Sequence, residues 1–132
     1  MDMKKRVILL AAAAACLLLP AWAVWGNTAL ERNTYTVWSD TLPDSFDGWR
    51  IAHISDLHNA EMGEDNQTLL EAIKDAAPDM IAITGDLIDS RHTDVDIALR
   101  FAERAVKIAP CYYVTGNHEA RTPEYQGGIN RA

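Results

Sequence analysis

The distribution of hydrophobic and polar residues divides the chain into two parts. An uncharged stretch, Val7–Trp25, lies near the N-terminus, and short apolar runs separated by polar segments follow it. Three of these runs, Arg50–Ser55, Met80–Thr84 and Cys111–Thr115, are short and rich in apolar or β-branched residues, as is typical of buried strands. Two segments with apolar residues at helical spacing separate them. The pattern therefore predicts the order strand–helix–strand–helix–strand.

The first helix is expected over Asn66–Ala76, where leucines and an isoleucine recur at helical spacing before Pro78. The second is expected from about Thr93, which can cap its start together with Asp96, to about Ala109, before Pro110. Its apolar face is predicted to consist of the residues Val95, Leu99, Ala102, Val106 and Ala109. Apolar strands that alternate with helices imply an α/β fold, with a βαβαβ parallel sheet buried on both faces.

The uncharged N-terminal stretch predicts a membrane anchor. Nineteen residues span about 28 Å as a helix, which is close to the thickness of a bilayer's hydrocarbon core. Lys4, Lys5 and Arg6 precede it, so residues 1–6 should stay in the cytoplasm while the remainder is exported. A cleaved signal peptide is the alternative, because Ala21–Ala23 has the small-x-small form of a cleavage site. We expect an anchor or signal helix over 1–26, a linker with an edge strand at Tyr35–Trp38 over 27–48, and a domain over 49–132.

The charge and cysteine content of the chain exclude some classes of function. Formal net charge is −7, and from Val7 onward nine basic residues stand against eighteen acidic ones. Nucleic-acid binding by a basic surface is therefore not expected. Such an acidic chain is compatible with carboxylates that surround bound cations. Its two cysteines, Cys16 and Cys111, are too few for a disulfide scaffold.

Chemically active residues follow each predicted strand. Asp56 and His58 follow the first, Asp86 follows the second, and Asn117 and His118 follow the third, at intervals of about one βαβ unit. Parallel strands end at the same edge, so these groups should converge there. We expect Gly85 and Gly116 to allow sharp turns beside them. This mixture of oxygen and nitrogen ligands suits Mn, Fe or Zn better than Ca or Mg.

The three motifs resemble those of the calcineurin-like metallophosphoesterase family, whose pattern is D-x-H, then G-D-x-x-D, then G-N-H-[ED]. The matching segments are Asp56–His58, Gly85–Asp89 and Gly116–Glu119. The N-terminal helix makes the chain similar to the membrane-attached bacterial branch. The resemblance implies hydrolysis of a phosphomonoester or phosphodiester by a water molecule that two divalent metal ions activate. It also implies that the chain folds as the first half of a four-layer α-β-β-α sandwich.

The resemblance assigns roles by position. Asp56 and His58 would bind the first metal, Asp86 would bridge the two, and Asn117 would bind the second. His118 would contact the substrate phosphate and the leaving group, and Asp89 would pair with His118. Glu119 is interpreted either as support for the ligands or as a helix cap.

The chain departs from the family pattern after Glu119. Family members supply further histidine ligands downstream, including a G-H-x-H motif, and no histidine follows His118 here. We therefore expect a truncated gene product with weak metal binding and an exposed sheet face. The alternative functions are a catalytically inactive, membrane-tethered fragment and a fragment that another chain complements. The expected location is the cell membrane, single-pass, with the domain outside the cytoplasm, or secretion after signal cleavage. The expected substrate is a phosphoester from lipid or the cell envelope.

Overall fold

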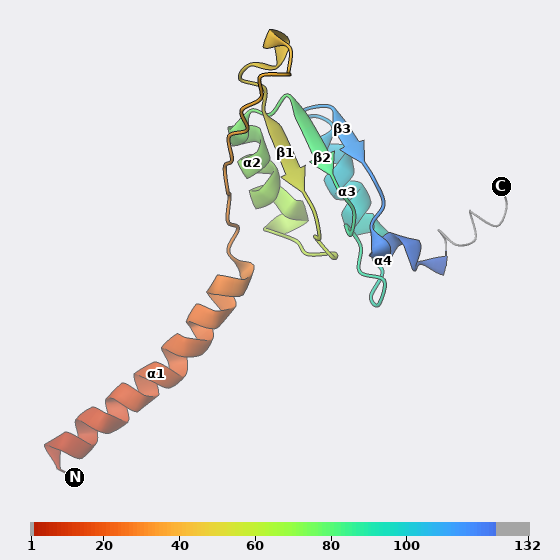
Figure 1. Cartoon of the computed structure of the whole chain (residues 1–132). Coiled ribbons are helices and arrows are strands. Elements are labelled where there is room, and N and C mark those ends of the chain that lie inside the picture. Colours follow the sequence, from red (N-terminus) through yellow and green to blue (C-terminus); the bar gives the residue numbers. More distant parts are fainter. Residues whose placement is uncertain (1, 124–132) are drawn as a thin grey trace. The chain divides into compact units, whose positions relative to one another are not determined.

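A computed structural model describes residues 2–123, which form two units divided between Glu31 and Arg32 (Figure 1). The first unit is essentially one helix, α1 (Met3–Thr28), with Pro20 inside it. Within Met3–Gly26 a window of 18 residues has a mean hydropathy of 2.5, and the helix is long and apolar enough to cross a membrane. None of the side chains in that window is buried, as expected for a helix that is apolar all round.

The second unit begins with an irregular segment. No strand forms over Tyr35–Trp38, so the expected edge strand is wrong, and these side chains are exposed. A strand needs a partner for its backbone N–H and C=O groups, and this segment pairs with none of the three strands. Helix α1 also extends two residues beyond the expected boundary at residue 26. A short 3-10 turn, Asp44–Phe46, precedes the sheet.

The remainder is the predicted βαβαβ unit. The described elements are β1 (Ile51–Ile54), a 3-10 turn (Glu64–Asn66), α2 (Gln67–Ala76), β2 (Met80–Ile83), α3 (Val95–Ala105), β3 (Cys111–Tyr113) and α4 (Asn117–Ala120). The strands lie in the order β1-β2-β3, and both pairs are parallel. This α/β arrangement is consistent with the first half of a metallophosphoesterase sandwich, as the sequence predicted.

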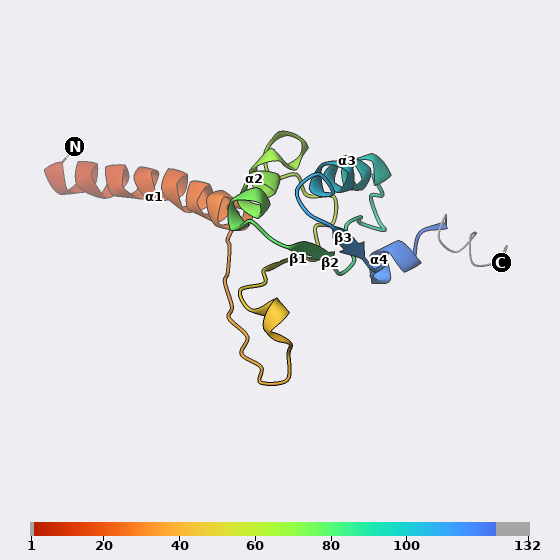
Figure 2. The ribbon, with the colours of Figure 1, turned by 90° about the horizontal axis from the view of Figure 1, so that it is seen from above.

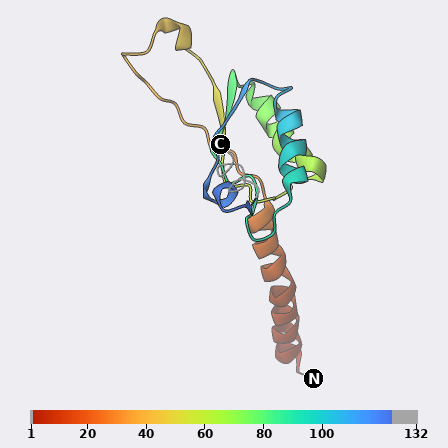
Figure 3. The ribbon, with the colours of Figure 1, turned by 90° about the vertical axis from the view of Figure 1, so that its right-hand side faces the viewer.

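Both long helices of this unit lie on the same side of the sheet (Figures 2 and 3). The central strand β2 directs Ile81 and Ile83 toward them, and these are 0% and 2% exposed. The core also contains the residues Leu69, Leu70, Ile73, Leu87, Ile88, Phe101, Ala105 and Ala109. The other face carries Ile51 and Tyr112, which are 59% and 64% exposed. The expected burial of both faces is therefore not found in residues 2–123.

Only part of the face expected for the second helix is buried. Ala109 is 8% exposed, as expected, but Leu99 is 53% exposed, and Val106, which follows the end of α3 at Ala105, is 57% exposed. Phe101 and Ala105, which were not assigned to this face, are 1% and 0% exposed. Apolar residues recur at helical spacing on two faces of this helix, and the bulky phenyl ring occupies the face that meets the sheet.

The start of α3 differs from the prediction as well. Asp94 rather than Thr93 is the N-cap, and its carboxylate accepts hydrogen bonds from the backbone N–H groups of Asp96 and Ile97. The Thr93 hydroxyl instead donates to the Asp89 carbonyl. An aspartate at the N-cap satisfies two backbone donors that have no partner within the helix.

Candidate functional site

The segments that follow β1 and β2 run side by side beyond the strands. The backbone N–H of Asp56 donates to the Gly85 carbonyl at 3.2 Å, and the N–H of His58 donates to the Asp86 carbonyl at 2.9 Å. Asn59 continues the series by donating to the Leu87 carbonyl at 2.9 Å. These backbone bonds bring the D-x-H segment against Asp86, at the edge where the parallel strands end (Figure 1).

Three of the predicted site residues have a left-handed backbone. The φ angles of Asp56, His58 and Asp86 are 57°, 48° and 53°. This conformation costs an L-residue about 1–2 kcal/mol. Backbone strain of this kind gathers at functional sites, where the surrounding structure holds the chain in place.

Two glycines allow the segments after β2 and β3 to pack closely. At Gly85 the φ angle is +94°, and an added Cβ would lie 2.4 Å from the Gly116 nitrogen. At Gly116 an added Cβ would lie 2.2 Å from Oδ1 of Asp86. Its φ angle, −95°, is ordinary. The expected role of Gly85 in a tight turn agrees with its backbone, but Gly116 is required for space rather than for a turn.

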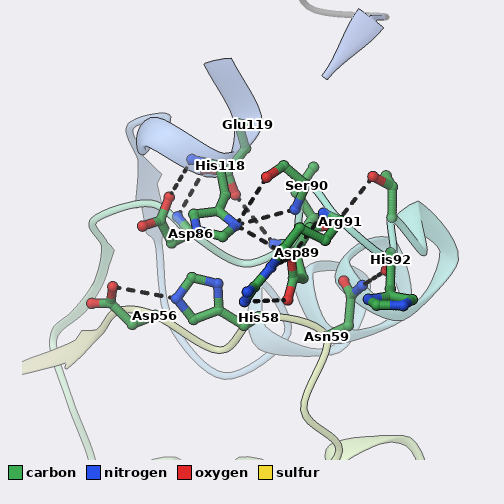
Figure 4. Close-up of polar contacts among 12 residues, drawn as sticks. Asp56, His58, Asn59, Asp86, Asp89, Ser90, Arg91, His92, His118 and Glu119 are labelled. Carbon is green, nitrogen blue, oxygen red and sulfur yellow. Dashed lines mark hydrogen bonds and ion pairs between the residues drawn. The ribbon is translucent and has the colours of Figure 1, made fainter. Parts of the chain in front are cut away.

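His58, Asp86 and His118 converge at this edge (Figure 4). One ligand atom from each of them lies within 4.8 Å of the others. The two imidazole rings meet edge to face, with centroids 4.4 Å apart. Asp86 is 8% exposed, and both histidines are half-buried. Three groups that can bind a divalent cation are thus contributed by three separate segments of the chain.

Asp56 and Asn117 lie beside this group. Oδ1 of Asp56 is 3.6 Å from Nε2 of His58, and the aspartate is exposed. In the amide orientation that satisfies both of its neighbours, Asn117 donates a hydrogen bond to Oδ2 of Asp86 and accepts one from the His118 N–H, each at 3.3 Å. All four predicted metal ligands therefore lie at one edge, and the division of these ligands between two metals stays a prediction.

His118 is held through its Nδ1 atom. This atom accepts a hydrogen bond from the Ser90 backbone N–H at 3.1 Å, and the Ser90 hydroxyl lies 3.3 Å away. Because a backbone N–H can only donate, Nδ1 must offer a lone pair, and the proton of the neutral ring lies on Nε2. Oδ1 of Asp89 is 3.5 Å from the same Nδ1.

Arg91 holds the Asp89 carboxylate in its ionised form. The Arg91 backbone N–H donates to Oδ1 of Asp89 at 2.8 Å, and the guanidinium contacts both carboxylate oxygens. These bonds lower the pKa of Asp89 to about 2. Asp89 is therefore a negative charge next to His118 at neutral pH.

Glu119 contacts the backbone of two loops. Its carboxylate accepts hydrogen bonds from the backbone N–H groups of Asp86, Leu87, Ile88 and Gly116, at 2.7–3.3 Å. Burial alone would raise the pKa of this carboxyl group, but the backbone donors outweigh it and lower the pKa below its ordinary value.

The chemistry of these residues fits a divalent cation. Nδ1 of His58 is buried and has no hydrogen-bond partner among residues 2–123. Asp86 adds a carboxylate, and Asn117 adds an amide oxygen. Imidazole, carboxylate and amide groups together form the mixed ligand set that transition metals accept. A buried ring nitrogen without a hydrogen-bond partner is costly, and a bound cation would remove that cost.

Some contacts at this site were not predicted. Ser90 was not singled out, because it reaches His118 mainly through its backbone N–H, which every residue except proline carries. Arg91 was not identified as the partner of Asp89, although its position two residues later allows a local contact. The sequence allows two roles for Glu119, and the position of this residue directly after G-N-H is the only signal that points to it.

Comparison with known proteins identifies relatives. The model of the calcineurin-like phosphoesterase family matches residues 50–131. The chain is 36% identical to an uncharacterized metallophosphoesterase of Bacillus subtilis over 66 residues, which cover 48% of this chain. It is 31% identical to a transmembrane protein with a metallophosphoesterase domain from Danio rerio over 93 residues, which cover 67% of this chain.

These matches cover 23% of the Bacillus protein and 21% of the Danio protein, so the chain spans less than a quarter of the length of either relative. No solved structure matches the chain significantly.

Proposed function

Because the chain belongs to the calcineurin-like phosphoesterase family, we propose that it contributes to the active site of a metal-dependent phosphoesterase that hydrolyses a phosphomonoester or phosphodiester. The observation that supports this proposal best is the convergence of His58, Asp86 and His118, whose ligand atoms lie within 4.8 Å of one another. These residues come from three separate segments, two loops and the short helix α4, and each segment follows a strand of one parallel sheet. That edge is the usual ligand site of open α/β folds.

The proposed metals are two Mn, Fe or Zn ions. Asp56 and His58 would hold one, Asn117 would hold the other, and Asp86 would contribute a ligand to both. Bound divalent cations would polarise a phosphoryl group and lower the pKa of a water molecule. Asp56, His58 and Asp86 all have a left-handed backbone, and the ligand atoms of His58 and Asp86 already lie within 4.8 Å of each other without an ion.

His118 is proposed as the proton donor to the leaving group. The Ser90 N–H occupies Nδ1, so Nε2 of the neutral ring carries a proton that it can donate. When the ring is protonated at both nitrogens, Nδ1 can donate to the Asp89 carboxylate, 3.5 Å away. Asp89 would thus stabilise the charged ring between proton transfers.

Binding of Mn²⁺ to the full chain in detergent micelles, measured by calorimetry, tests the metal site. We expect binding by the unsubstituted chain, its loss in Asp86→Ala, and no change in Asp75→Ala, whose carboxylate is exposed on α2. Asp86→Ala that binds Mn²⁺ as tightly as the unsubstituted chain would contradict the proposal. No binding at millimolar Mn²⁺ would contradict it as well and would favour an inactive fragment.

Hydrolysis tests the role of His118. An aryl phosphate and an aryl phosphodiester are the probes, with Mn²⁺ alone as the background. We expect His118→Ala to lower the rate while Mn²⁺ affinity is kept. A parallel loss of Mn²⁺ affinity would instead make His118 a metal ligand. Activity that rises steeply with protein concentration would show that another copy of the chain completes the site.

We also propose that α1 spans a membrane once, with residues 1–6 in the cytoplasm and the phosphoesterase domain on the other side. The length and hydropathy of α1 and the printed name of the Danio relative support membrane association. This location makes a lipid or envelope phosphoester the proposed substrate class.

A reporter enzyme that is active only outside the cytoplasm, fused to the C-terminus, tests the orientation. We expect an active reporter, and replacement of Lys4, Lys5 and Arg6 by glutamate should reduce its activity. An inactive reporter on the unsubstituted chain would contradict this orientation. A mature protein that has lost its first 23 residues would show that the segment is a cleaved signal peptide.

A further inference from the structure

The buried carboxylate of Glu119 joins two loops that belong to different strands. Oε2 accepts hydrogen bonds from the N–H groups of Gly116 and Asp86, both at 2.8 Å. Oε1 accepts from Leu87 at 2.7 Å and from Ile88 at 3.3 Å. The Gly116 bond alone would be an ordinary cap for the short helix α4. The other three bonds reach the loop after β2, which a cap does not require.

Asp86 is the residue that these bonds surround. Its backbone is left-handed, with φ of 53°, and its N–H points to Glu119 rather than into the sheet. Its Oδ1 accepts a hydrogen bond from the His118 N–H at 2.8 Å. Two consecutive residues of α4 therefore hold Asp86. His118 binds the Asp86 carboxylate, and Glu119 binds the Asp86 backbone N–H.

We infer that Glu119 is a positioning residue that keeps Asp86 in the left-handed conformation from which its carboxylate faces His58 and His118. This inference rests on the proposed metal site. Without the Glu119 carboxylate, three successive N–H groups of the loop, at Asp86, Leu87 and Ile88, would lose their acceptor. The strained backbone at Asp86 would then be free to relax, and its carboxylate would move away from the other ligands.

Glu119→Gln tests the inference with little change in shape. The glutamine amide places an NH₂ group where two backbone N–H groups donate, so half of the contacts become repulsive. Partners that orient metal ligands typically contribute about 10–100-fold to metal affinity. We therefore expect the dissociation constant for Mn²⁺ to rise by about 10–100-fold. The same substitution at Glu103, which is exposed on α3, should leave that constant unchanged.

A second control separates positioning from general loosening. The buried hydroxyl of Thr122 donates to the Glu119 carbonyl at 2.7 Å, so Thr122→Val weakens the end of α4 without touching the carboxylate. Measurements are made at a temperature at which circular dichroism shows every variant folded. Equal Mn²⁺ affinity in Glu119→Gln and the unsubstituted chain would overturn the inference. An equal loss in Thr122→Val would overturn it as well.

Hydrogen exchange in the metal-free chain provides a readout that does not depend on the metal. We expect Glu119→Gln to speed exchange at the amides of Asp86, Leu87, Ile88 and Gly116 together, while the amide of Ile83 in β2 keeps its protection. Unchanged exchange at these four amides would refute the inference. If the unsubstituted chain binds no Mn²⁺, the metal proposal fails, and exchange alone then decides whether Glu119 holds Asp86.

Discussion

Gly116→Ala should displace the central carboxylate of the site at a moderate cost in stability. The φ angle at this position is −95°, which alanine adopts without strain. The new methyl group, however, would lie 2.2 Å from Oδ1 and 2.7 Å from the backbone nitrogen of Asp86. Both distances are far below van der Waals contact, so the Asp86 side chain must rotate or the two loops must separate. Either movement takes the carboxylate away from His58 and His118.

The expected loss of stability in Gly116→Ala is that of an overpacked contact. Overpacking a tight contact costs about 1–3 kcal/mol. In a domain of this size each kcal/mol lowers the unfolding temperature by about 4–8 °C. We expect the free energy of unfolding to fall by about 2 kcal/mol, which lowers the midpoint of thermal unfolding by about 8–16 °C. Mn²⁺ affinity should fall at least about tenfold, since the movement affects a metal ligand directly.

Alanine substitutions at two other glycines distinguish the effect of a steric clash from the effect of backbone strain. Gly48→Ala introduces strain alone, because φ is +74° and nothing lies within 4 Å of the added Cβ. Gly85→Ala combines strain at φ +94° with a clash against the Gly116 backbone, 2.4 Å away. Thermal unfolding and Mn²⁺ titration of all three variants should rank Gly85→Ala as the least stable, and Gly48→Ala should keep its metal affinity. If Gly116→Ala binds Mn²⁺ like the unsubstituted chain, the loops are not packed as described.

Three further predictions concern the elements that support the site. Phe101→Ala should lower the free energy of unfolding by about 3–5 kcal/mol, because the ring is 1% exposed. Leu99→Ala should lower it much less, because Leu99 is 53% exposed. Equal losses for the two variants in chemical denaturation would contradict the observed buried face of α3. Asp94→Ala should cost about 1 kcal/mol by removing the cap of α3, and an unchanged denaturation midpoint would argue against that cap. The pKa of Asp89 is lowered from 3.8 to about 2, so its ionised form stabilises the fold above pH 4, and this contribution disappears as the pH falls from about 4 to 2. Arg91→Ala removes the guanidinium but keeps the backbone N–H, which is the larger cause, so the pKa of Asp89 should move only part of the way toward 3.8 in an NMR titration; an unchanged pKa would exclude the guanidinium as a contributor.

The alternation of apolar runs was enough to predict the order of strands and helices. Apolar strands separated by segments of helical spacing leave few arrangements other than parallel βαβ units. The placement of the D-x-H, G-D and G-N-H segments after successive strands then predicted one shared edge, because parallel strands end on the same side. These conclusions depend on local pattern and on general rules of chain geometry, so they did not require the structure.

The packing of each element was harder to predict. Helix α3 carries apolar residues on two faces, and periodicity cannot indicate which face meets the sheet. The position of the sheet decides this, and it selected Phe101 and Ala105 over Leu99 and Val106. Tyr35–Trp38 shows the opposite case, because its residues favour a strand but no neighbouring edge pairs with it.

The sequence by itself determined the order of the elements, the apolar character of α1 and the set of residues that gather at the sheet edge. Only the tertiary structure decided how those residues are held. Glu119 accepts hydrogen bonds from backbone N–H groups, and Ser90 donates its own backbone N–H to His118. Almost every residue has a backbone N–H, so the sequence does not indicate which of them form these bonds. Gly116 is needed because Asp86 lies against it, although the two are thirty residues apart in the chain. Contacts between distant segments depend on where folding places them, and that placement is a property of the whole packed domain.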